Sequence, residues 1–276
     1  RSISLLGKTV ETSRGNISYD YLVLALGSET NYRNVPGAKE YTFPLKTLSD
    51  ALRLKNHFIH AFELESTLSD PAEIARALHF VVVGGGATGV ELVTEMDDFL
   101  RGTFARYFAK RLIENAKITL LHAGDDLLQN FSREIRIKSK HVLRKKGIVV
   151  RLGVSVQEVR PSSILLDTGE VVESDTVVWT AGVKPTEIAI EEEVARERGR
   201  IIVNQYLQIP DHPDVFVMGD MAAFRNPGSA DALPMLAQVA HKESRGVARN
   251  IIRRVQGKSL LAYTYKPLGD LVSLGE

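Results

Sequence analysis

Apolar positions in the middle of the chain switch between short continuous runs and longer stretches with helical spacing. The run "HFVVV" (79–83) predicts a buried strand, a glycine turn follows it, and a helix begins at about Ala87. The run "KITLLHAG" predicts the next buried strand, and "SREIRIKSKHVLRKKG" predicts an amphipathic helix that ends at Gly147. Because strands alternate with helices here, we expect a parallel sheet with helical crossovers.

The flanking segments carry other patterns. The segment "KTVETSRGNISYDYLVLALGS" predicts a hairpin that leads into a buried strand, Tyr21 to Leu26. Residues 148–183 predict four short strands, and an acidic helix is expected over 187–198. Two further strands, "IIVNQYLQI" and "DVFVMGD", then precede a long final helix, "ALPMLAQVAHKESRGVARNIIRRV".

The composition excludes several kinds of functional site, mainly because the residues that such sites need are missing. The 276 residues carry a formal net charge of +1, so nothing indicates a nucleic-acid partner. There is no cysteine, which excludes a redox-active disulfide, a cysteine nucleophile and a thiolate zinc site. The histidines show no metal-ligand spacing, and no apolar run approaches the ~18 residues that span a bilayer. The start at Arg1 and the apolar end, "LGDLVSLGE", indicate an internal piece of a longer protein.

Gly84, Gly86 and Gly89 satisfy the pattern G-x-G-x-x-G directly after a strand and at the start of a helix. In this pattern the first glycine permits a tight turn, and the second lets the backbone approach a pyrophosphate. The third lets helix and strand pack closely. The helix N-terminus, at Ala87 and Thr88, then presents unpaired N–H groups to the phosphates. We therefore predict dinucleotide binding here; the alternative is a glycine turn that serves packing alone.

The residue that ends the second strand distinguishes NADH from NADPH in such sites, because a carboxylate there accepts from the ribose hydroxyls. In "ITLLHAGDD" that position belongs to His122, which lies 33 residues beyond Gly89, so the crossover must be long. Asp125 and Asp126 are close enough in sequence to take its place. The other interpretation of His122 is a surface histidine with no ligand role.

A second strand end also carries a ligand-type residue. The segment "DVFVMGDMAAF" places Gly219 and Asp220 at the carboxyl end of a short strand, where ligands dock in open α/β sheets. Together with "YDYLVLALGS" and "TVVWTAGVKP", it resembles the flavoproteins that have two dinucleotide-binding domains. The resemblance implies that Gly27 lies beside FAD, that Asp220 holds the ribitol chain, and that Ala181 and Gly182 line the nicotinamide side.

Two further segments narrow the resemblance to one family. "GGGATGVEL", with Glu91, and "PMLAQVAHKESRGVARNI" resemble type II NADH dehydrogenases, which are single-subunit NADH:quinone oxidoreductases. The resemblance runs from about Ile17 to Ile252. It implies an α/β fold in which a Rossmann-like NAD(P)H-binding domain is inserted in an incomplete FAD-binding Rossmann-like domain. The expected bounds are 71–183 for the inserted domain, with 1–70 and 184–276 as the FAD-binding part.

The resemblance also gives roles to single residues. Glu91 is expected to orient the nicotinamide carboxamide and to assist proton movement. Otherwise it is a first-turn carboxylate that complements the helix dipole, worth ~0.3–1 kcal/mol. The family's quinone motif A-Q-x-A-x-Q has Lys242 here in place of the second Gln. Gln238, Ala240 and Lys242 form the expected acceptor site, and Gln238 also faces the flavin.

These residues lead to an expected function. We expect an FAD-dependent oxidoreductase that passes hydride from NADH, or from NADPH, to flavin and electrons on to a quinone, with Glu91 as its catalytic residue and no metal. The expected location is peripheral, on the cytoplasmic side of a membrane or on the mitochondrial inner membrane, through a segment beyond Glu276; a homodimer is one option. The alternatives are a soluble flavin reductase with a protein or small-molecule acceptor, and a non-catalytic dinucleotide-binding module. The segment alone is expected to bind FAD weakly or not at all, and to be inactive.

Overall fold

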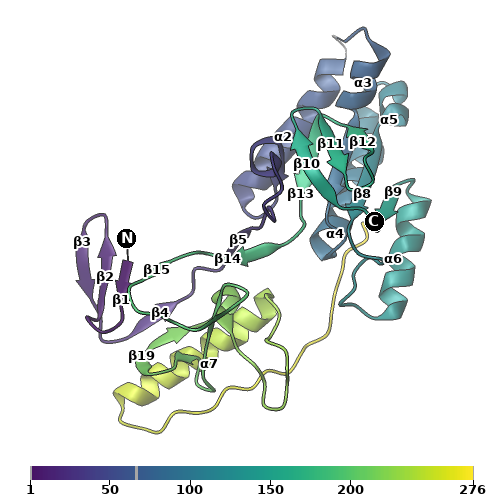
Figure 1. The fold of residues 1–276 in the computed structure, drawn as a ribbon. Helices are drawn as coiled ribbons and strands as arrows, with labels where there is room; N and C mark the ends of the chain where they lie inside the picture. Colours follow the sequence, from purple (N-terminus) through teal and green to yellow (C-terminus); the bar gives the residue numbers. More distant parts are fainter. Residues whose placement is uncertain (1, 66–67, 276) are drawn as a thin grey trace. The chain divides into compact units, whose positions relative to one another are not determined.

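The computed structural model describes residues 2–65 and 68–275. It divides the chain into two compact units, which can be followed by colour in Figure 1. The central unit consists of Thr30–Val183 with Asp270–Glu276, and the terminal unit consists of Arg1–Glu29 with Lys184–Gly269. The chain therefore leaves the terminal unit, completes most of the central unit and returns, as expected for one domain inserted in another.

A five-stranded parallel sheet forms the middle of the central unit. All five residues of its middle strand, β7 (His79–Val83), are buried, as its apolar run requires for a strand covered on both faces. The expected parallel sheet with helical crossovers is confirmed. The strand order is β6 (Phe43–Pro44), β13 (Thr176–Trp179), β7, β8 (Lys117–His122) and β9 (Val149–Leu152), and each pairing is parallel.

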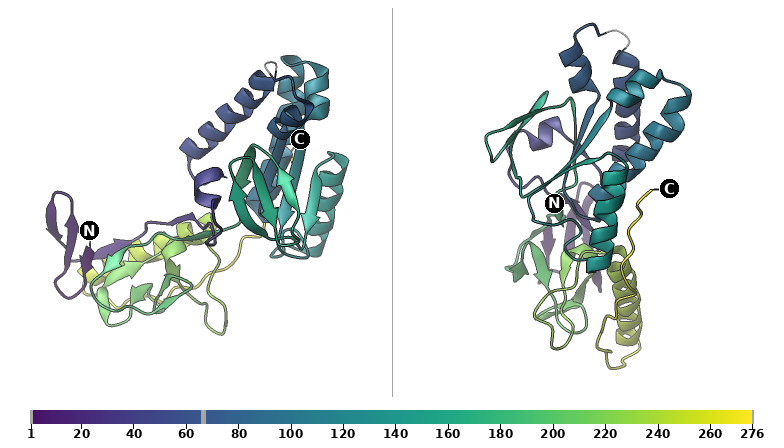
Figure 2. Two further views of the ribbon diagram at one scale, coloured as in Figure 1. Left: turned by 45° about the horizontal axis from the view of Figure 1, so that its top comes forward. Right: turned by 90° about the vertical axis from the view of Figure 1, so that its right-hand side faces the viewer.

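Helices cover one face of this sheet, and a small antiparallel sheet covers the other (Figure 1 and Figure 2). Phe80 and Val82 of β7 face the helices, where Phe58 and Phe62 surround Phe80 with ring centroids 4.4 and 6.1 Å away. The helices of this layer are α2 (Leu48–Glu65), α3 (Pro71–Ala77), α4 (Ala87–Asp98), α5 (Lys110–Asn115) and α6 (Arg133–Lys145).

Val81 and Val83 point to the opposite face, toward the small sheet. This sheet consists of β10 (Val156–Arg160), β11 (Ser163–Leu166) and β12 (Val171–Glu173). Residues 148–183 thus hold five complete strands and the first residue of a sixth, and not the expected four. The chain turns at Gly153, which has a φ of +66°, so β9 joins the large sheet and β10 the small one.

Small sheets and one long helix build the terminal unit. Helix α7 (Ala237–Val255) packs Val239 and Val247 into a core with Phe216 and Phe224. In the sheet that matters for the site, β4 (Leu22–Leu24) pairs in parallel with β19 (His212–Val217). β18 (Gln208–Ile209) pairs with β19 on its other side, and β14 (Val183–Pro185) pairs with β5 (Ser28–Thr30). Two further sheets have the orders β15 (Ala189–Ile190), β1 (Ser2–Ser4), β2 (Thr9–Thr12), β3 (Gly15–Ser18), and β16 (Arg196–Glu197), β17 (Arg200–Ile202), β20 (Ala222–Ala223).

The acidic helix expected over 187–198 is wrong, because this segment forms β15 and β16. Ile188, Ile190 and Val194 pack into the core of the terminal unit, and the first two stand at the two-residue spacing of a strand. Glu192 accepts hydrogen bonds from the N–H groups of residues 5 and 6, at 2.8 and 2.9 Å. A carboxylate that the sequence pattern placed on a helix surface therefore caps backbone donors.

The expected domain bounds fit the compact units at residue 183 and differ elsewhere. Residues 30–70 are expected in the FAD-binding part, but they pack in the central unit because Phe58 and Phe62 fill its main core. Residues 270–276 also belong to the central unit. Which unit binds which cofactor stays a proposal. Among the described residues, no helix combines the length and the apolar character that crossing a membrane requires.

A buried histidine, His79, and a partly buried one, His57, make the stability of the central unit depend on pH. His79 contacts the Glu173 carbonyl through Nδ1 (2.7 Å) and the Thr119 hydroxyl through Nε2 (2.8 Å). His57 contacts the Thr176 hydroxyl through Nε2 (2.8 Å). Burial lowers the pKa of both rings below the usual 6.5, so both stay neutral in the folded unit.

We predict that acid weakens this unit. Because the folded rings bind protons less readily than the unfolded ones, their contribution to stability is present above pH 6.5. It is lost as the pH falls toward their folded pKa values. His79→Gln should flatten the dependence of the free energy of unfolding on pH between 5 and 7, measured in urea. His141→Gln, on the exposed side of α6, is the control. Equal slopes for both variants and the wild type would contradict the prediction.

Candidate functional site

The glycine turn lies between β7 and α4, and its three glycines meet three different constraints. Gly84 has φ +122°, and a Cβ there would lie 2.6 Å from the carbonyl of Thr180. A Cβ on Gly89 would overlap the carbonyl oxygen of Gly84, because α4 approaches the turn closely. A Cβ on Gly86 would meet nothing within 4 Å. Gly84 and Gly89 thus serve the turn and its packing, while Gly86 faces open space, as a ligand-facing position requires.

The start of α4 suits an anion. Gly86 is its N-cap residue and makes no side-chain cap, so the N–H groups at Ala87 and Thr88 have no such partner. The helix dipole adds a partial positive charge at this end. Thr180, directly after β13, places its Oγ1 2.9 Å from the carbonyl of Val83 at the end of β7 and 3.2 Å from the carbonyl of Gly84 in the turn. The sequence pattern did not single out Thr180, because its role depends on β13 lying beside β7.

His122 holds the same turn from the second strand. Its Nδ1 accepts a hydrogen bond from the Gly85 N–H (3.1 Å), which leaves the proton of the neutral ring on Nε2. The ring lies so close that a Cβ on Gly85 would come within 2.7 Å of the His122 Cγ. Burial lowers the pKa of His122, and the charge of Asp126 opposes this effect only in part. The ring is therefore a partly buried element of the turn and not a fully exposed side chain; its role toward a ligand stays a prediction.

The two acids near His122 differ in their surroundings. Asp126 pairs with Lys140 (2.7 Å) and Arg136 (3.1 Å) of α6, and the hydrogen bond with Lys140 lowers the pKa of Asp126. Asp125 is exposed. Since Asp126 is already engaged by two cations, Asp125 is the better placed of the two to accept from ribose hydroxyls.

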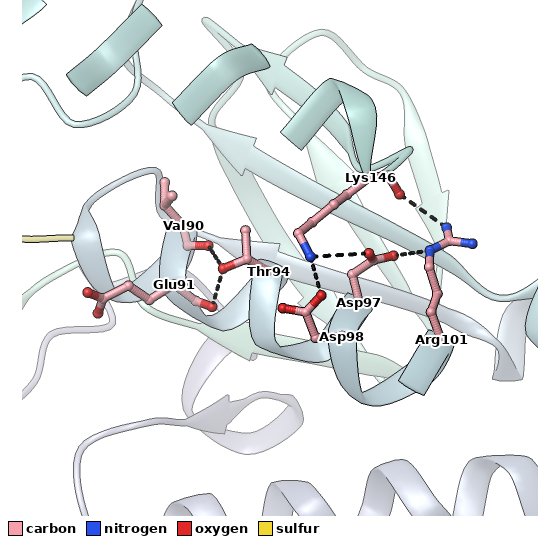
Figure 3. Close-up of polar contacts among 7 residues, drawn as sticks. All are labelled: Val90, Glu91, Thr94, Asp97, Asp98, Arg101 and Lys146. Atoms are coloured by element: carbon pink, nitrogen blue, oxygen red, sulfur yellow. Dashed lines mark hydrogen bonds and ion pairs between the residues drawn. The ribbon is translucent and has the colours of Figure 1, made fainter. Parts of the chain in front are cut away.

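Glu91 stands in α4 after the glycine turn, and its Oε1 accepts from the Ser273 N–H at 3.1 Å. The sequence predicted that Glu91 lies in the first turn of the helix. It is the fifth residue of α4 and therefore lies in the second turn. Interaction with the helix dipole falls off within the first turn, which weakens the dipole alternative for this residue. Figure 3 shows Glu91 pointing away from the charged residues farther along α4.

Those charged residues form a separate cluster that joins the end of α4 to the end of α6 (Figure 3). Asp97, which is 3% exposed, accepts from Arg101 Nε at 2.7 Å, and Asp98 pairs with Lys146. Arg101 also donates to the Lys146 carbonyl at 3.1 Å. Each carboxylate faces a cation, so the cluster ties two helices together and we give it no role in binding.

The segment after β13 runs beside the glycine turn. A Cβ on Gly84 would lie 2.8 Å from the Ala181 nitrogen, so Ala181 and Gly182 come next to the turn. Gly182 has φ +125°. Arg33 Nε donates to the Ala181 carbonyl at 2.8 Å and fixes this segment. Arg33 lies in a loop without a distinctive pattern, which is why the sequence did not indicate it.

The second candidate site lies in the terminal unit, at the carboxyl ends of β4 and β19. Because these strands pair in parallel, the turns that follow them begin side by side. Ser28 Oγ donates to Asp220 Oδ2 at 2.5 Å. Gly27 and Gly219 have φ values of +70° and +66°, which favour glycine in both turns. The structure thus brings Gly27, Gly219 and Asp220 together and adds Ser28, which the sequence pattern did not single out.

The beginning of α7 packs against the same turn. A Cβ on Gly219 would lie 3.2 Å from the Cβ of Ala240. Gln238 Nε2 (3.4 Å) and Lys242 Nζ (2.7 Å) each donate to a backbone carbonyl of residues 266–269. Ala240 therefore contacts the Gly219 turn, whereas Gln238 and Lys242 contact the segment that follows α7.

The expected site residues thus fall into two groups, one in each unit. In the described part of the chain, no three His, Asp or Glu side chains cluster closely enough to hold a metal ion. The central group contains Gly84, Gly86, Ala87, Thr88, Gly89, Glu91, His122, Ala181 and Gly182, and the terminal group contains Gly27, Gly219, Asp220, Gln238, Ala240 and Lys242.

The different surroundings of Gly86 and Gly89 predict opposite outcomes for the same substitution. Gly89→Ala forces a Cβ into the carbonyl of Gly84 and should cost about 1–3 kcal/mol or more in the free energy of unfolding. Gly86→Ala meets no neighbour, and its φ of −78° suits any residue, so the change should stay within about 1 kcal/mol. Urea unfolding of the two variants checks this; equal losses would show that the close contact is not rigid.

Comparison with known proteins agrees with this geometry. The sequence pattern of the family "Pyridine nucleotide-disulphide oxidoreductase" matches residues 4–244. The chain is 30% identical to the "Type II NADH:quinone oxidoreductase" of Staphylococcus saprophyticus over 97% of its length and 66% of that protein. It is also 30% identical to the "Internal alternative NAD(P)H-ubiquinone oxidoreductase A1, mitochondrial" of Solanum tuberosum, over 97% of the chain and 56% of that protein.

A solved structure shows the same fold. "NDH2 from plasmodium falciparum in complex with NADH" superposes with a TM-score of 0.73 at 23% identity, over 80% of this chain and 49% of that one. The resemblance to type II NADH dehydrogenases and the α/β fold expected from the sequence are thus confirmed, although the chain spans only about 56–66% of the curated relatives. From the match over residues 4–244, this chain belongs to the pyridine nucleotide-disulphide oxidoreductase family.

Proposed function

We propose that this chain is part of an FAD-dependent oxidoreductase that takes hydride from NAD(P)H and passes electrons to a quinone. The observation that carries the proposal is the presence of two strand-end sites. One is an open glycine turn at a helix N-terminus, and the other is a Gly-Asp turn with a hydroxyl partner. Two such sites suit two dinucleotides. The names of the relatives, which are NADH:quinone and NAD(P)H-ubiquinone oxidoreductases, support the quinone.

The central unit has the features that NAD(P)H binding needs. The open N-terminus of α4 would receive the pyrophosphate on its N–H groups, with Gly86 letting the backbone come close. Ala181 and Gly182 lie next to the turn, on the side where the nicotinamide is proposed to extend. Glu91, one helical turn farther, would orient the carboxamide group and is proposed as the catalytic residue.

The terminal unit fits the polar chain of FAD. A carboxylate is an acceptor for ribitol hydroxyls, and Asp220 stands at the end of a parallel strand between two glycine turns. Ser28 orients this carboxylate through Oδ2. When bound, FAD supplies the hydride-accepting and electron-passing chemistry, and the protein supplies binding and orientation.

The acceptor site is proposed at the start of α7, where Gln238, Ala240 and Lys242 stand. The small side chain of Ala240 lets α7 approach Gly219, which brings the helix close to the flavin-side turn. Lys242 offers three donors on a long stem where the family motif has a second glutamine, so it could hold a quinone carbonyl by a charged hydrogen bond. We further propose a peripheral membrane location, which suits a quinone acceptor; a homodimer stays a prediction.

The test uses the full-length protein and two glycine variants. Gly86→Ala should weaken NADH binding by at least tenfold, about 1.4 kcal/mol, because its Cβ enters the space left for the pyrophosphate. Gly102→Ala, at an equally open position in the π-helical segment Phe99–Thr103, is the matched control and should bind NADH as the wild type does. Both variants are compared with the wild type by anaerobic reduction of the flavin with NADH, followed by its reoxidation with a quinone. A wild-type protein without flavin, or with a flavin that NADH does not reduce, would overturn the proposed function.

The surroundings of His122 lead to a prediction about cofactor choice. A neutral ring in place of a carboxylate removes both an acceptor for the ribose and the repulsion of a 2′-phosphate, so the enzyme should use NADPH as well as NADH. His122→Glu should raise the ratio of kcat/KM for NADH over NADPH by roughly one to two decades.

The pH dependence of this choice should be weaker than for an ordinary histidine. Because burial lowers the pKa of His122, less of the ring gains charge between pH 8 and 6 than in an exposed histidine, and NADPH use should improve correspondingly less over that range. The measurement is the same kcat/KM ratio across pH, with His141→Glu on α6 as the control. A wild-type ratio already above about a thousand for NADH would show that Asp125 makes the choice and not His122.

A further inference from the structure

Glu243 is an acid inside the terminal unit, at the back of the Gly219–Asp220 turn. It lies on α7 and is 0% exposed. Its Oε2 accepts a hydrogen bond from the Gly219 N–H at 2.5 Å. A buried acid is costly to keep, so its presence on a helix that packs with apolar residues needs a reason.

The groups around Glu243 do not neutralise it by a close ion pair. Arg200 of β17, which is 8% exposed, uses its Nη atoms on the carbonyls of Leu233 (2.7 Å) and Ala222. Asp220, in the turn itself, adds a second negative charge nearby, and the hydroxyl of Tyr263 lies among the buried polar atoms without a hydrogen-bond partner in the described chain. The one hydrogen bond seen for the carboxyl group of Glu243 in the described chain is therefore the one to the turn; its Oε1 has no partner there.

The balance of these effects sets the charge of Glu243. Burial raises the pKa of Glu243 to about 7, against the opposing effects of the Gly219 hydrogen bond and the Arg200 charge, and with a smaller contribution from Asp220 in the same direction. Tyr263 and Tyr265, from the segment after α7, complete the titratable groups on this side. The acid and the carboxylate forms can both accept from an N–H, so the contact with Gly219 survives either state.

The Gly219 N–H matters because of where the residue stands. Gly219 has φ +66° and stands two residues after the end of β19, and the next residue is the carboxylate that faces Ser28. A turn with left-handed backbone has no regular hydrogen-bond ladder to hold it. The bond from Gly219 to Glu243 supplies that hold and fixes the direction in which Asp220 leaves the strand.

We propose that Glu243 is a positioning residue that fixes the Gly219–Asp220 turn through the Gly219 N–H and thereby sets the affinity for the flavin's polar chain. The second half of this inference rests on the proposed function. The first half concerns only the backbone of the terminal unit.

The test compares substitutions that keep or remove the acceptor. Glu243→Gln retains an oxygen for the Gly219 N–H, while Glu243→Leu has a similar volume and no acceptor. Asn250→Ala is the control: Asn250 is 1% exposed on the same helix, two turns farther, and holds Leu261 instead of the turn. In full-length protein, Glu243→Leu should weaken FAD binding by at least tenfold, and Glu243→Gln and Asn250→Ala should leave it within a factor of three.

A second measurement needs no flavin. Amide hydrogen exchange at Gly219 should be slow in the wild-type chain and in Glu243→Gln, and at least tenfold faster in Glu243→Leu, with no such change in Asn250→Ala. Exchange of the Gly219 amide in the wild type at the rate of an unprotected surface amide would overturn the inference, whether or not any variant folds. Wild-type protein that binds no FAD would instead defeat the proposed function and leave the exchange result standing. FAD binding in Glu243→Leu equal to the wild type would overturn the inference alone.

The titration of Glu243 gives a readout that a merely space-filling residue would not move. Since its folded pKa lies above its unfolded value of 4.5, its contribution to stability is present below pH 4.5 and is lost as the pH rises to about 7. Over that window the unfolding constant of the wild type should rise by up to roughly 300-fold relative to Glu243→Gln. Parallel pH profiles for the two proteins would show that Glu243 is not held in the buried site described here, and would overturn the inference.

Discussion

The contact between α4 and the turn that precedes it is the constraint on which the central unit depends. Where Gly89 meets the carbonyl of Gly84, the helix lies closer to the strand end than any side chain permits. That closeness aims the N–H groups of the helix at the space beside Gly86. It also leaves room for Thr180 to bond the turn from the neighbouring strand. A wider spacing would disperse the N–H groups and separate the turn from the segment after β13.

In the terminal unit, a side chain holds the helix at the strand-end turn. In the central unit the helix follows the glycine turn directly, so backbone groups alone join the two. In the terminal unit α7 begins at Ala237, well after Gly219, and chain connectivity cannot hold the helix at the turn. Ala240 makes the close approach, and Glu243 spans the gap to the Gly219 N–H. An acid buried at some cost is the result of building a strand-end site from segments that are separate in sequence.

The sequence was most informative where a local pattern determines the structure. The apolar run 79–83 and the three glycines identify the strand, the turn and the helix, because each glycine answers a steric need of its own neighbours. Patterns failed where partners come from far away: Thr180, Ser28 and Glu243 gain their roles only once strands pair. The segment 187–198 misled because its acids suggested a helix, while the spacing of its apolar residues suits an edge strand. His122 was found by position, but its neutrality follows from the Gly85 N–H, which no sequence pattern shows.

The start of α7 is the segment at which the proposed function would place the electron acceptor. The chain belongs to a family named for disulphide chemistry, yet within its residues there is no thiol to receive electrons. On the proposed function, a quinone would come to the flavin itself, and the protein would leave it an approach. We propose the start of α7 for this approach, because Ala240 is small at the turn. Gln238 and Lys242 stand on the same helix and donate to the segment that follows it. An uncharged, diffusible acceptor with carbonyl oxygens suits such donors better than a protein thiol would.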